Sequence, residues 1–492
     1  MGYYLRWAAT VTGVVLFSLG LAWQQGAAVF PDPDVFYHMG MAEHLWQFGL
    51  AGQFSGLAPT TLGVHYTDQH FLLHALLAVF ITMMTPVVGT KVFIVIALLS
   101  CLTTFGWMLR VLRLPGWWLG VIALGMTNPW LFRLSLVKAT PLALILVWLA
   151  VIVLAKKRYR WLVPIGAVYV WTHGGFVLLP LIVAAWSLSA AIVSRKITWT
   201  IVLPFVYTVL GIALALVTHP AFPDNLYFYW EQLVQIGAIN YQQYIGVGGE
   251  WYPYVPGNLL FGHAVLFVAA IVGCVLHIAM RRRLTTPQLF FLLVTIGMVV
   301  LTLKSKRYVE YLSPLLAATA VSFIGVLWQL PWLRWLHLPL RHQVTRLLAG
   351  CVVVMAVVPM VLSDYSGLVN DLHGGQATTY LQGVGQYLAS LPPGTVVAPS
   401  DWDDFPALWY GAPNQQYLIG LDATFLYRAD PNRYLAWKHI TLGEAADPAA
   451  DVATVAAQYY VVAKDHQPMF DQVTKVGGTV VYEDAEAWVL TI

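Results

Sequence analysis

The stretch Val29-Phe30-Pro31-Asp32-Pro33-Asp34-Val35-Phe36-Tyr37-His38 opens a polar loop in an otherwise strongly apolar chain, and both the fold class and the candidate site follow from it. Pro31 and Pro33 fix their own φ and disfavour helix in the residue before each, so Asp32 and Asp34 are expected on an extended turn. After them the apolar spacing becomes helical. For a lone Asp34, an ordinary helix N-cap would be the simpler interpretation.

The loop runs to about residue 74 and gathers acids and histidines without any Lys or Arg. These residues are Asp32, Asp34, His38, Glu43, His44, His65, Asp68, His70 and His74. Carboxylates and imidazoles carry protons and bind divalent metals. The loop therefore indicates metal binding or acid/base chemistry, with Asp34, Asp68 and His70 as candidate metal ligands.

The chain is 59% hydrophobic and only 10% charged, whereas a soluble domain has about 25% charged residues. These values predict a polytopic membrane protein. The first apolar segment, residues 7–23, is interpreted as an uncleaved anchor because many apolar segments follow it. All three cysteines fall in hydrophobic runs, so no disulfide framework is expected.

Runs of about 20 apolar residues predict spanning helices, and the chain has about 11 of them. They are expected at residues 7–23, 92–112, 117–132, 139–155, 161–171, 176–193, 199–217, 259–278, 289–303, 309–330 and 347–362. The run at 71–84 is short for a crossing, so we expect a re-entrant or interfacial helix there. Residues 1–362 are thus predicted to form a transmembrane domain with an outer catalytic loop at residues 25–90.

Charge predicts the orientation, because Lys and Arg collect in cytoplasmic loops. With the N-terminus inside, the basic clusters at residues 156–160 and 281–283 lie inside, and the carboxylates of the membrane domain lie outside. Counting residues 71–84 as a full span would put both clusters outside. The candidate site is therefore predicted at the extracytoplasmic face of the cell membrane.

Residues 363–492 are predicted to form a soluble extracytoplasmic α/β domain, because short β-rich runs alternate there with helical stretches. Strands are expected at 395–398, 416–419, 459–463, 479–482 and 487–492, and helices at 377–391 and 451–458. The chain has no Gly-rich nucleotide loop, which argues against an NTP-driven machine.

Two groups of cations break the charge bias by lying at the outer ends of spans. Arg133 and Lys138 form the first, and snorkelling to lipid phosphate would explain either residue alone. The second lies in Lys304-Ser305-Lys306-Arg307-Tyr308-Val309-Glu310-Tyr311, where Glu310 is already one step inside a span. Ionisable groups at that depth are costly and indicate function.

A planar Arg such as Arg307 suits a bidentate grip on phosphate. The structural alternative is an ion pair with Glu310, three positions along and on the same helix face. The predicted substrate-binding residues of the two groups are Arg307, Lys304, Lys306, Tyr308, Glu310, Arg133 and Lys138.

Two further pairings of acid and tryptophan are candidates for sugar or acceptor binding. Glu250 lies beside Trp251 in a long aromatic loop, most of whose aromatics are ordinary interface residues. Trp402, Asp403 and Asp404 directly follow a predicted strand, where ligands bind in α/β sheets. An Asx-rich turn with a structural Trp is the open alternative for the second pairing.

Together these pieces resemble the GT-C superfamily of polyprenyl-phosphate-dependent glycosyltransferases, and most closely the catalytic subunits of oligosaccharyltransferases. The resemblance spans nearly the whole chain: an Asp-x-Asp loop after the first span, many spans and a C-terminal extracytoplasmic domain. It implies that Asp34 binds a divalent metal (Mg²⁺ or Mn²⁺) and the acceptor, that Glu250 is catalytic, and that Arg307 binds the lipid phosphate.

The chain departs from the family pattern at two places. The second acidic motif would fall at residues 133–140, which contain Arg133 and Lys138 but no acid. The Trp-Trp-Asp-Tyr-Gly motif that reads the acceptor sequon is only echoed, by residues 401–405. The second departure argues against a protein N-glycosylation enzyme.

The sequence thus predicts an inverting membrane glycosyltransferase that moves a sugar or oligosaccharide from a polyprenyl (di)phosphate carrier to a glycan, lipid or protein acceptor, with no nucleic-acid partner. Asp34, with Asp32 beside it, would be general base or metal ligand. The alternatives are a polysaccharide ligase or polymerase, and a non-enzymatic transporter or assembly protein. A transporter should carry polar groups near mid-membrane, whereas here they collect at one face.

Overall fold

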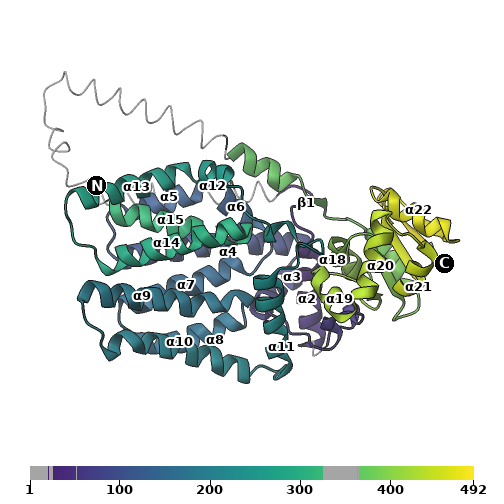
Figure 1. The fold of residues 1–492 in the computed structure, drawn as a ribbon, viewed down its shortest axis with the longest axis horizontal. Helices are drawn as coiled ribbons and strands as arrows, with labels where there is room; N and C mark the ends of the chain where they lie inside the picture. The colour runs from purple at the N-terminus through teal and green to yellow at the C-terminus, as the bar shows by residue number, and fades with distance from the viewer. Residues whose placement is uncertain (1–19, 21–25, 51–52, 325–362, 364) are drawn as a thin grey trace, which may run out of the picture. The chain divides into compact units, whose positions relative to one another are not determined.

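The computed structural model describes residues 20, 26–50, 53–324, 363 and 365–492 (Figure 1). The chain divides into two compact units, each built from segments that are distant in sequence. Unit 1 comprises Met1–Gly26, Ile94–Ala215 and Glu250–His373, and unit 2 comprises Ala27–Phe93, Leu216–Gly249 and Gly374–Ile492. The predicted boundary at residue 362 falls outside the described residues and stays a prediction.

Unit 1 is a bundle of apolar helices (Figure 1). They are most of α4 (Pro86–Val111), α5 (Trp117–Gly125), α6 (Asn128–Ser135), α7 (Thr140–Ala155), α8 (Leu162–Val170), α9 (Leu178–Ser194), most of α10 (Trp199–Val217), α12 (Pro256–Gly262), α13 (Ala264–Ala279), α14 (Thr286–Lys304) and α15 (Val309–Ile324). Helix α14 packs against α9 and α15, and α15 packs against α5 and α13. The buried core includes Phe105 and Trp148, whose ring centres lie 5.5 Å apart.

Four helices of the described chain are long and apolar enough to cross a membrane: α4, Gly174–Ser194, α10 and α14. The bent pairs α6 with α7 (114°) and α12 with α13 (81°) raise the number to six if each pair is one span. The prediction of about 11 spans of about 20 residues is not confirmed. The segments expected at 7–23 and 347–362 lie outside the described residues. The one expected at 117–132 is broken between α5 and α6, whose first turn contains Pro129.

The surface of α10 is that of a lipid-facing helix. Leu210, Leu214 and Val217 are exposed, although the helix contains no charged residue. A continuous apolar face that no other described residue covers is stable against hydrocarbon and unfavourable in water. Together with the other apolar helices, this face identifies an integral membrane protein.

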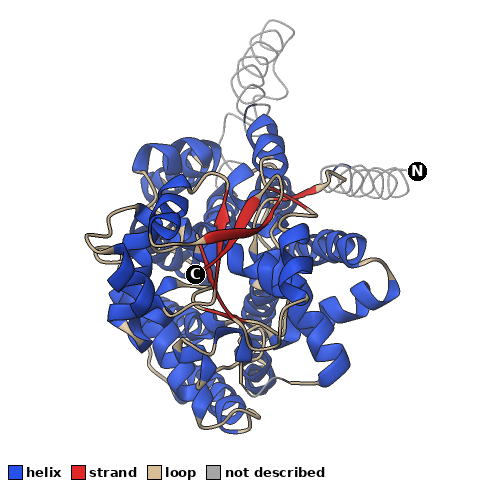
Figure 2. Ribbon diagram, turned by 90° about the vertical axis from the view of Figure 1, so that its right-hand side faces the viewer, coloured by secondary structure: helices blue, strands red, loops and turns tan. Residues whose placement is uncertain are grey.

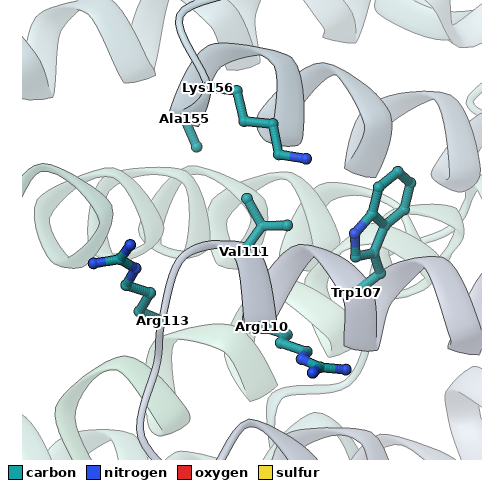
Figure 3. Close-up of a pocket in the computed structure, with 6 residues that line it drawn as sticks. All are labelled: Trp107, Arg110, Val111, Arg113, Ala155 and Lys156. Carbon is teal, nitrogen blue, oxygen red and sulfur yellow. The ribbon is translucent and has the colours of Figure 1, made fainter.

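Charged side chains mark both ends of α7. Lys138 precedes the helix and Lys156 follows it, and its 16 residues span about 24 Å at about 1.5 Å per residue, close to the about 30 Å of a hydrocarbon core. At the second end, Arg110, Arg113 and Lys156 line a hollow of about 590 Å³ (Figure 3). The Lys156 ammonium lies 5.4 Å from the ring centre of Trp107, which also lines the hollow.

Unit 2 contains a five-stranded mixed sheet covered by short helices (Figure 2). Its helices are α2 (Asp34–Phe48), α3 (Phe71–Met83), α11 (Asp224–Trp230), a π-helix (Glu231–Ile239), α17 (Gln382–Ala389), α18 (Phe405–Gly411), α19 (Ala423–Ala429), α20 (Pro431–Leu442), α21 (Pro448–Val455) and α22 (Gln467–Lys475). Its strands are β1 (Val29–Phe30), β2 (Gln376–Ala377), β3 (Val396–Pro399), β4 (Gln416–Tyr417), β5 (Tyr459–Ala463), β6 (Thr479–Glu483) and β7 (Ala487–Thr491). The sheet order is β4-β3-β5-β7-β6, with β3 parallel to β4 and β5, and β7 antiparallel to β5 and β6.

The first loop and the C-terminal segment fold together within unit 2. β1 pairs antiparallel with β2, and Tyr410 on α18 donates a hydrogen bond of 3.0 Å to Glu43 on α2. The two helices approach closely at Gly40, where an added Cβ would lie 2.7 Å from the Trp409 ring. The loop that carries the Asp-x-Asp motif is therefore held by the same unit that contains the sheet.

Candidate functional site

Glu250 holds three cations together in unit 1. Its Oε2 accepts hydrogen bonds from Arg133 Nη2 at 2.6 Å and Lys138 Nζ at 3.3 Å. Its Oε1 lies 3.4 Å from Arg307 Nη1. Arg133 lies in α6, Lys138 in the turn before α7, and Arg307 in the turn between α14 and α15. Three cations from the two predicted groups therefore lie together, and we call them the basic cluster (Arg133, Lys138 and Arg307).

Glu310 is the second acid of this region, and it pairs with Arg133, whereas the structural alternative considered for the sequence was a pair with Arg307. Glu310 is 1% exposed and accepts hydrogen bonds of 2.6 Å from both Arg133 Nε and Thr140 Oγ1. In the described part of the chain, the ion pair of Arg307 is with Glu250 and not with Glu310. The alternative of an ion pair between Arg307 and Glu310 is not found, because Arg307 lies in a 3₁₀ turn, Lys306–Tyr308, and so does not share the helical face of α15.

The basic cluster controls the protonation of Glu250. Burial acts to raise the pKa of this carboxyl, but Lys138, Arg307 and Arg133 hold the pKa well below its usual range. A carboxylate with so low a pKa stays ionised and is a weak proton acceptor. These ion pairs favour Glu250 as an anchor for the cations, and its expected catalytic role stays a prediction.

The other candidate residues of unit 1 lie close to Glu250 and Arg307 in the sequence. Trp251 ends the 3₁₀ turn that contains Glu250, and Lys304, Lys306 and Tyr308 lie at the end of α14 and in the 3₁₀ turn that follows it. The guanidinium carbon of Arg307 lies 5.0 Å from the ring centre of Trp251. Ser305 Oγ donates to the Glu250 carbonyl at 2.9 Å, and Lys306 N donates to the Tyr252 carbonyl at 2.9 Å.

The carboxylates of the first loop lie beside those that follow β3 in unit 2. Asp34 is the first residue of α2, and Asp32 Oδ1 accepts a hydrogen bond of 2.9 Å from its backbone N–H. Desolvation, followed by the charges of Asp34, Asp401 and Asp32, acts to raise the pKa of Asp403, although this residue lies at an exposed position. Asp403 is therefore close enough to Asp34 for the two charges to interact. Asp32, Asp34 and Asp403 thus form one group, which we call the acidic cluster.

The turn that carries Asp403 is fixed by a hydrogen bond to the neighbouring residue Asp404. Trp402–Asp404 is a 3₁₀ turn between β3 and α18, and Asp404 accepts a hydrogen bond of 2.7 Å from Tyr380. Burial acts first to raise the pKa of Asp404, which reaches about 6. Trp402 is half-buried in this turn. Both the site and the Asx-turn interpretations of this segment predict such a turn, so its role stays a prediction.

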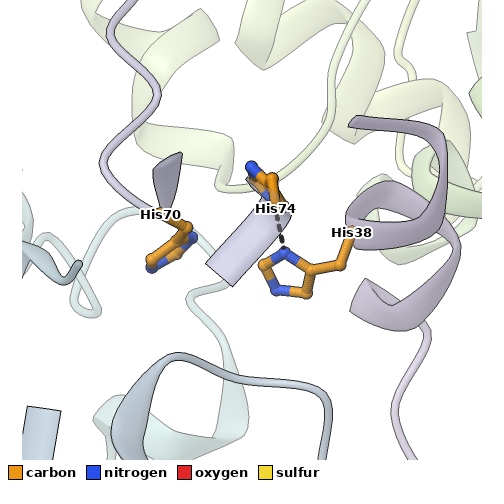
Figure 4. Close-up of side chains that lie close together, drawn as sticks. All are labelled: His38, His70 and His74. Atoms are coloured by element: carbon orange, nitrogen blue, oxygen red, sulfur yellow. Dashed lines mark hydrogen bonds between the residues drawn. The ribbon is translucent and has the colours of Figure 1, made fainter. Parts of the chain in front are cut away.

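Three histidines of the first loop gather in unit 2 (Figure 4). One ring nitrogen from each of His38, His70 and His74 lies within 4.8 Å of the others. Asp68 accepts hydrogen bonds from His74 Nδ1 at 2.8 Å and from the His70 backbone N–H at 3.0 Å. Imidazole and carboxylate donors fit a divalent metal ion. The sequence proposal of Asp34, Asp68 and His70 as ligands omitted His38 and His74, although His70 and His74 stand one helical turn apart.

Solved structures match nearly the whole chain. No protein-family model matches the sequence, and the curated proteins likewise give no match.

One similar structure is the archaeal oligosaccharyltransferase AglB from Archaeoglobus fulgidus in complex with an inhibitory peptide and a dolichol-phosphate, with a TM-score of 0.64, 11% identity, and coverage of 98% of this chain and 74% of that chain. The same oligosaccharyltransferase in complex with Zn and sulfate gives a TM-score of 0.59 at 11% identity, covering 97% of this chain and 72% of that one. ArnT from Cupriavidus metallidurans bound to undecaprenyl phosphate gives a TM-score of 0.57 at 16% identity, covering 97% and 98%. The resemblance to GT-C enzymes is thus confirmed for the fold.

Proposed function

We propose that the protein is an inverting membrane glycosyltransferase that moves a sugar or oligosaccharide from a polyprenyl (di)phosphate carrier to an acceptor at the extracytoplasmic face. The chain has the fold of proteins that were solved with dolichol-phosphate and undecaprenyl phosphate. The finer topology of about 11 spans and the sites themselves belong to this proposal.

The observation that carries the proposal is the basic cluster. Arg133, Lys138 and Arg307 meet at the ends of helices that belong to an apolar bundle. A polyprenyl carrier joins an apolar chain to an anionic phosphate, so its binding site needs cations where lipid-facing helices end. Oriented donors there also stabilise the charge that develops on the departing phosphate.

In the proposed reaction, an acceptor oxygen or nitrogen bonds to the anomeric carbon on the face opposite the phosphate. The bond from this carbon to the phosphate oxygen breaks, and its electron pair leaves with the polyprenyl (di)phosphate. Asp34 takes the proton of the acceptor. Arg307, Lys304 and Lys306 hold the phosphate, and Arg133 and Lys138 are secondary contacts.

The remaining candidates are assigned to binding. Trp251 stacks on the sugar ring, while Trp402, Asp403 and Asp404 contact the acceptor. A divalent ion held by Asp34, Asp68 and His70 would supply a positive charge that polarises the acceptor.

Replacing Arg307 by lysine should weaken carrier binding about tenfold or more. Lysine keeps the charge but loses the bidentate geometry, and one charge-assisted hydrogen bond is worth about 1.5–3 kcal/mol, at least about a factor of ten. Binding of a polyprenyl phosphate to the purified protein in detergent measures the effect. Arg282→Lys is the matched control, because Arg282 is an exposed arginine of unit 1 outside the basic cluster.

A purely structural Arg307 would give a different pattern. If it only paired with Glu250, Arg307→Lys would bind the carrier normally. The charge exchange Arg307→Glu with Glu250→Arg would then restore binding. Either result removes Arg307 from the phosphate site.

Orientation is tested by labelling exposed positions. On a background without Cys101, Cys274 and Cys351, an impermeant thiol reagent should modify Ser55→Cys in intact cells and leave Arg282→Cys unmodified until lysis. Both positions are exposed in the structure, so the side of the membrane on which each residue lies decides whether it is labelled. Labelling of Arg282→Cys alone would reverse the proposed topology.

A further inference from the structure

We propose that the chain carries a metal site built on three imidazoles, His38, His70 and His74, which takes a Zn²⁺-class ion in place of a hard ion held by carboxylates. The inference revises the metal part of the proposed function: it keeps His70 as a ligand and replaces Asp34 and Asp68 by His38 and His74. It does not depend on glycosyl transfer, because ion binding can be measured without substrate.

The geometry of the three histidines carries the proposal (Figure 4). His38 Nδ1 and His74 Nε2 lie 2.8 Å apart, and one nitrogen from each of the three rings falls within 4.8 Å of the others. Zn–N bonds of about 2.0–2.1 Å place two ligand nitrogens of a tetrahedral site about 3.4 Å apart. The nitrogens therefore lie near ligand spacing before any ion is bound.

The hydrogen bonds of His74 fix which of its two ring nitrogens can bind an ion. Asp68 accepts from His74 Nδ1 at 2.8 Å, so the neutral ring of His74 presents its Nε2 lone pair toward His38. A carboxylate that holds the far nitrogen of a histidine is the usual outer partner of a metal ligand, and it orients the ring. Asp68 also accepts a hydrogen bond from the His70 backbone N–H and so fixes the backbone position of His70, the second ligand.

Burial separates this group from a chance surface cluster. His38 is 3% exposed, His74 is fully buried and Asp68 is 5% exposed.

In the absence of an ion, one proton on His38 Nδ1 forms the hydrogen bond to His74 Nε2. An ion replaces that hydrogen bond when His38 shifts its proton to Nε2, so both facing nitrogens become donors of lone pairs without any net loss of protons.

Ligand chemistry selects the ion. Imidazole favours Zn²⁺ and its neighbours, whereas Mg²⁺ prefers oxygen ligands. Three protein ligands leave a fourth position open, as in catalytic zinc sites. His70 is the partly exposed member, so the open position is accessible from its side.

The test is equilibrium dialysis of the full-length, chelator-stripped protein in detergent against Zn²⁺ alone or Mg²⁺ alone, with elemental analysis of the bound metal. We expect one Zn²⁺ per chain and no stoichiometric Mg²⁺. His70→Ala and His74→Ala should abolish stoichiometric binding, and Asp68→Asn should weaken it by about 10–100-fold. His44→Ala, a half-buried histidine on α2 outside the cluster, should bind as the wild type does.

Asp34→Asn separates the two ligand sets. Retained Zn²⁺ binding supports the imidazole site, whereas lost binding would show that Asp34 is itself a metal ligand and would overturn the proposal. Equal binding by wild type and His70→Ala would also overturn the proposal. His70 is the least buried of the three ligands, so His70→Ala is the variant least expected to disturb folding. Co²⁺ in the wild type gives a further readout: visible bands of a four-coordinate site that Zn²⁺ abolishes support the proposal, and their absence contradicts it.

Discussion

Asp34→Asn should lower glycosyl transfer by at least about 100-fold while leaving expression and folding intact. A positioned general base contributes about 10²–10⁴-fold to rate, and asparagine cannot take a proton. As a first-turn acid of α2, Asp34 adds only about 0.3–1 kcal/mol through the helix dipole. The measurement is turnover of purified variants, together with their thermal unfolding midpoints.

Two variants control for this effect. Asp32→Asn should be milder, because its side-chain oxygen can still accept the hydrogen bond from the Asp34 backbone. Asp224→Asn changes another first-residue acid, in α11 of the same unit, which is exposed and paired with His65. Near-native turnover of Asp34→Asn would exclude Asp34 as base or metal ligand.

Arg133→Met should destabilise the protein by about 3–5 kcal/mol, the cost of breaking a buried ion pair by removing one partner. Arg133 bridges Glu250 and Glu310, and Glu310 is almost fully buried. The substitution therefore leaves Glu310 with the Thr140 hydroxyl as its described hydrogen-bond donor. Reversible unfolding in mixed detergent micelles measures the change in free energy.

The second change Glu310→Gln should recover part of this loss, because it removes the uncompensated charge. Arg110→Met is the matched control: Arg110 also lies at a helix end of unit 1, but it is exposed, and its loss should cost no more than about 0.5 kcal/mol. Equal stability of Arg133→Met and Arg110→Met would show that the bridge contributes nothing.

Local pattern predicted most elements because hydropathy and strand propensity are local properties. The span expected at 199–217 coincides with α10, and the five strands expected after residue 363 match β3 to β7 within a few residues. Hydropathy cannot detect a bend, so the expected spans at 117–132 and 259–278 each appear as two helices. The prolines in the first turns of α6 and α12, Pro129 and Pro256, were the available signals.

Contacts between distant segments were less predictable. The sequence separated the loop at 25–90 from residues 363–492, whereas the structure groups Ala27–Phe93 with Leu216–Gly249 and Gly374–Ile492 in unit 2. The open alternative of an ion pair between Arg307 and Glu310 assumed a continuous helix from residue 307 to residue 310, whereas Arg307 lies in a 3₁₀ turn and pairs with Glu250. That Arg133 would meet both Glu250 and Glu310 depends on helix packing, which no periodicity encodes.

The central claim is tested most directly by mass spectrometry of lipids. Purified wild-type protein is incubated with a membrane lipid extract and divalent metals, with Asp34→Asn in parallel. The proposed function predicts that a lipid-linked sugar disappears and the matching polyprenyl (di)phosphate appears with the wild type alone. Unchanged lipids, or equal conversion by Asp34→Asn, would contradict it.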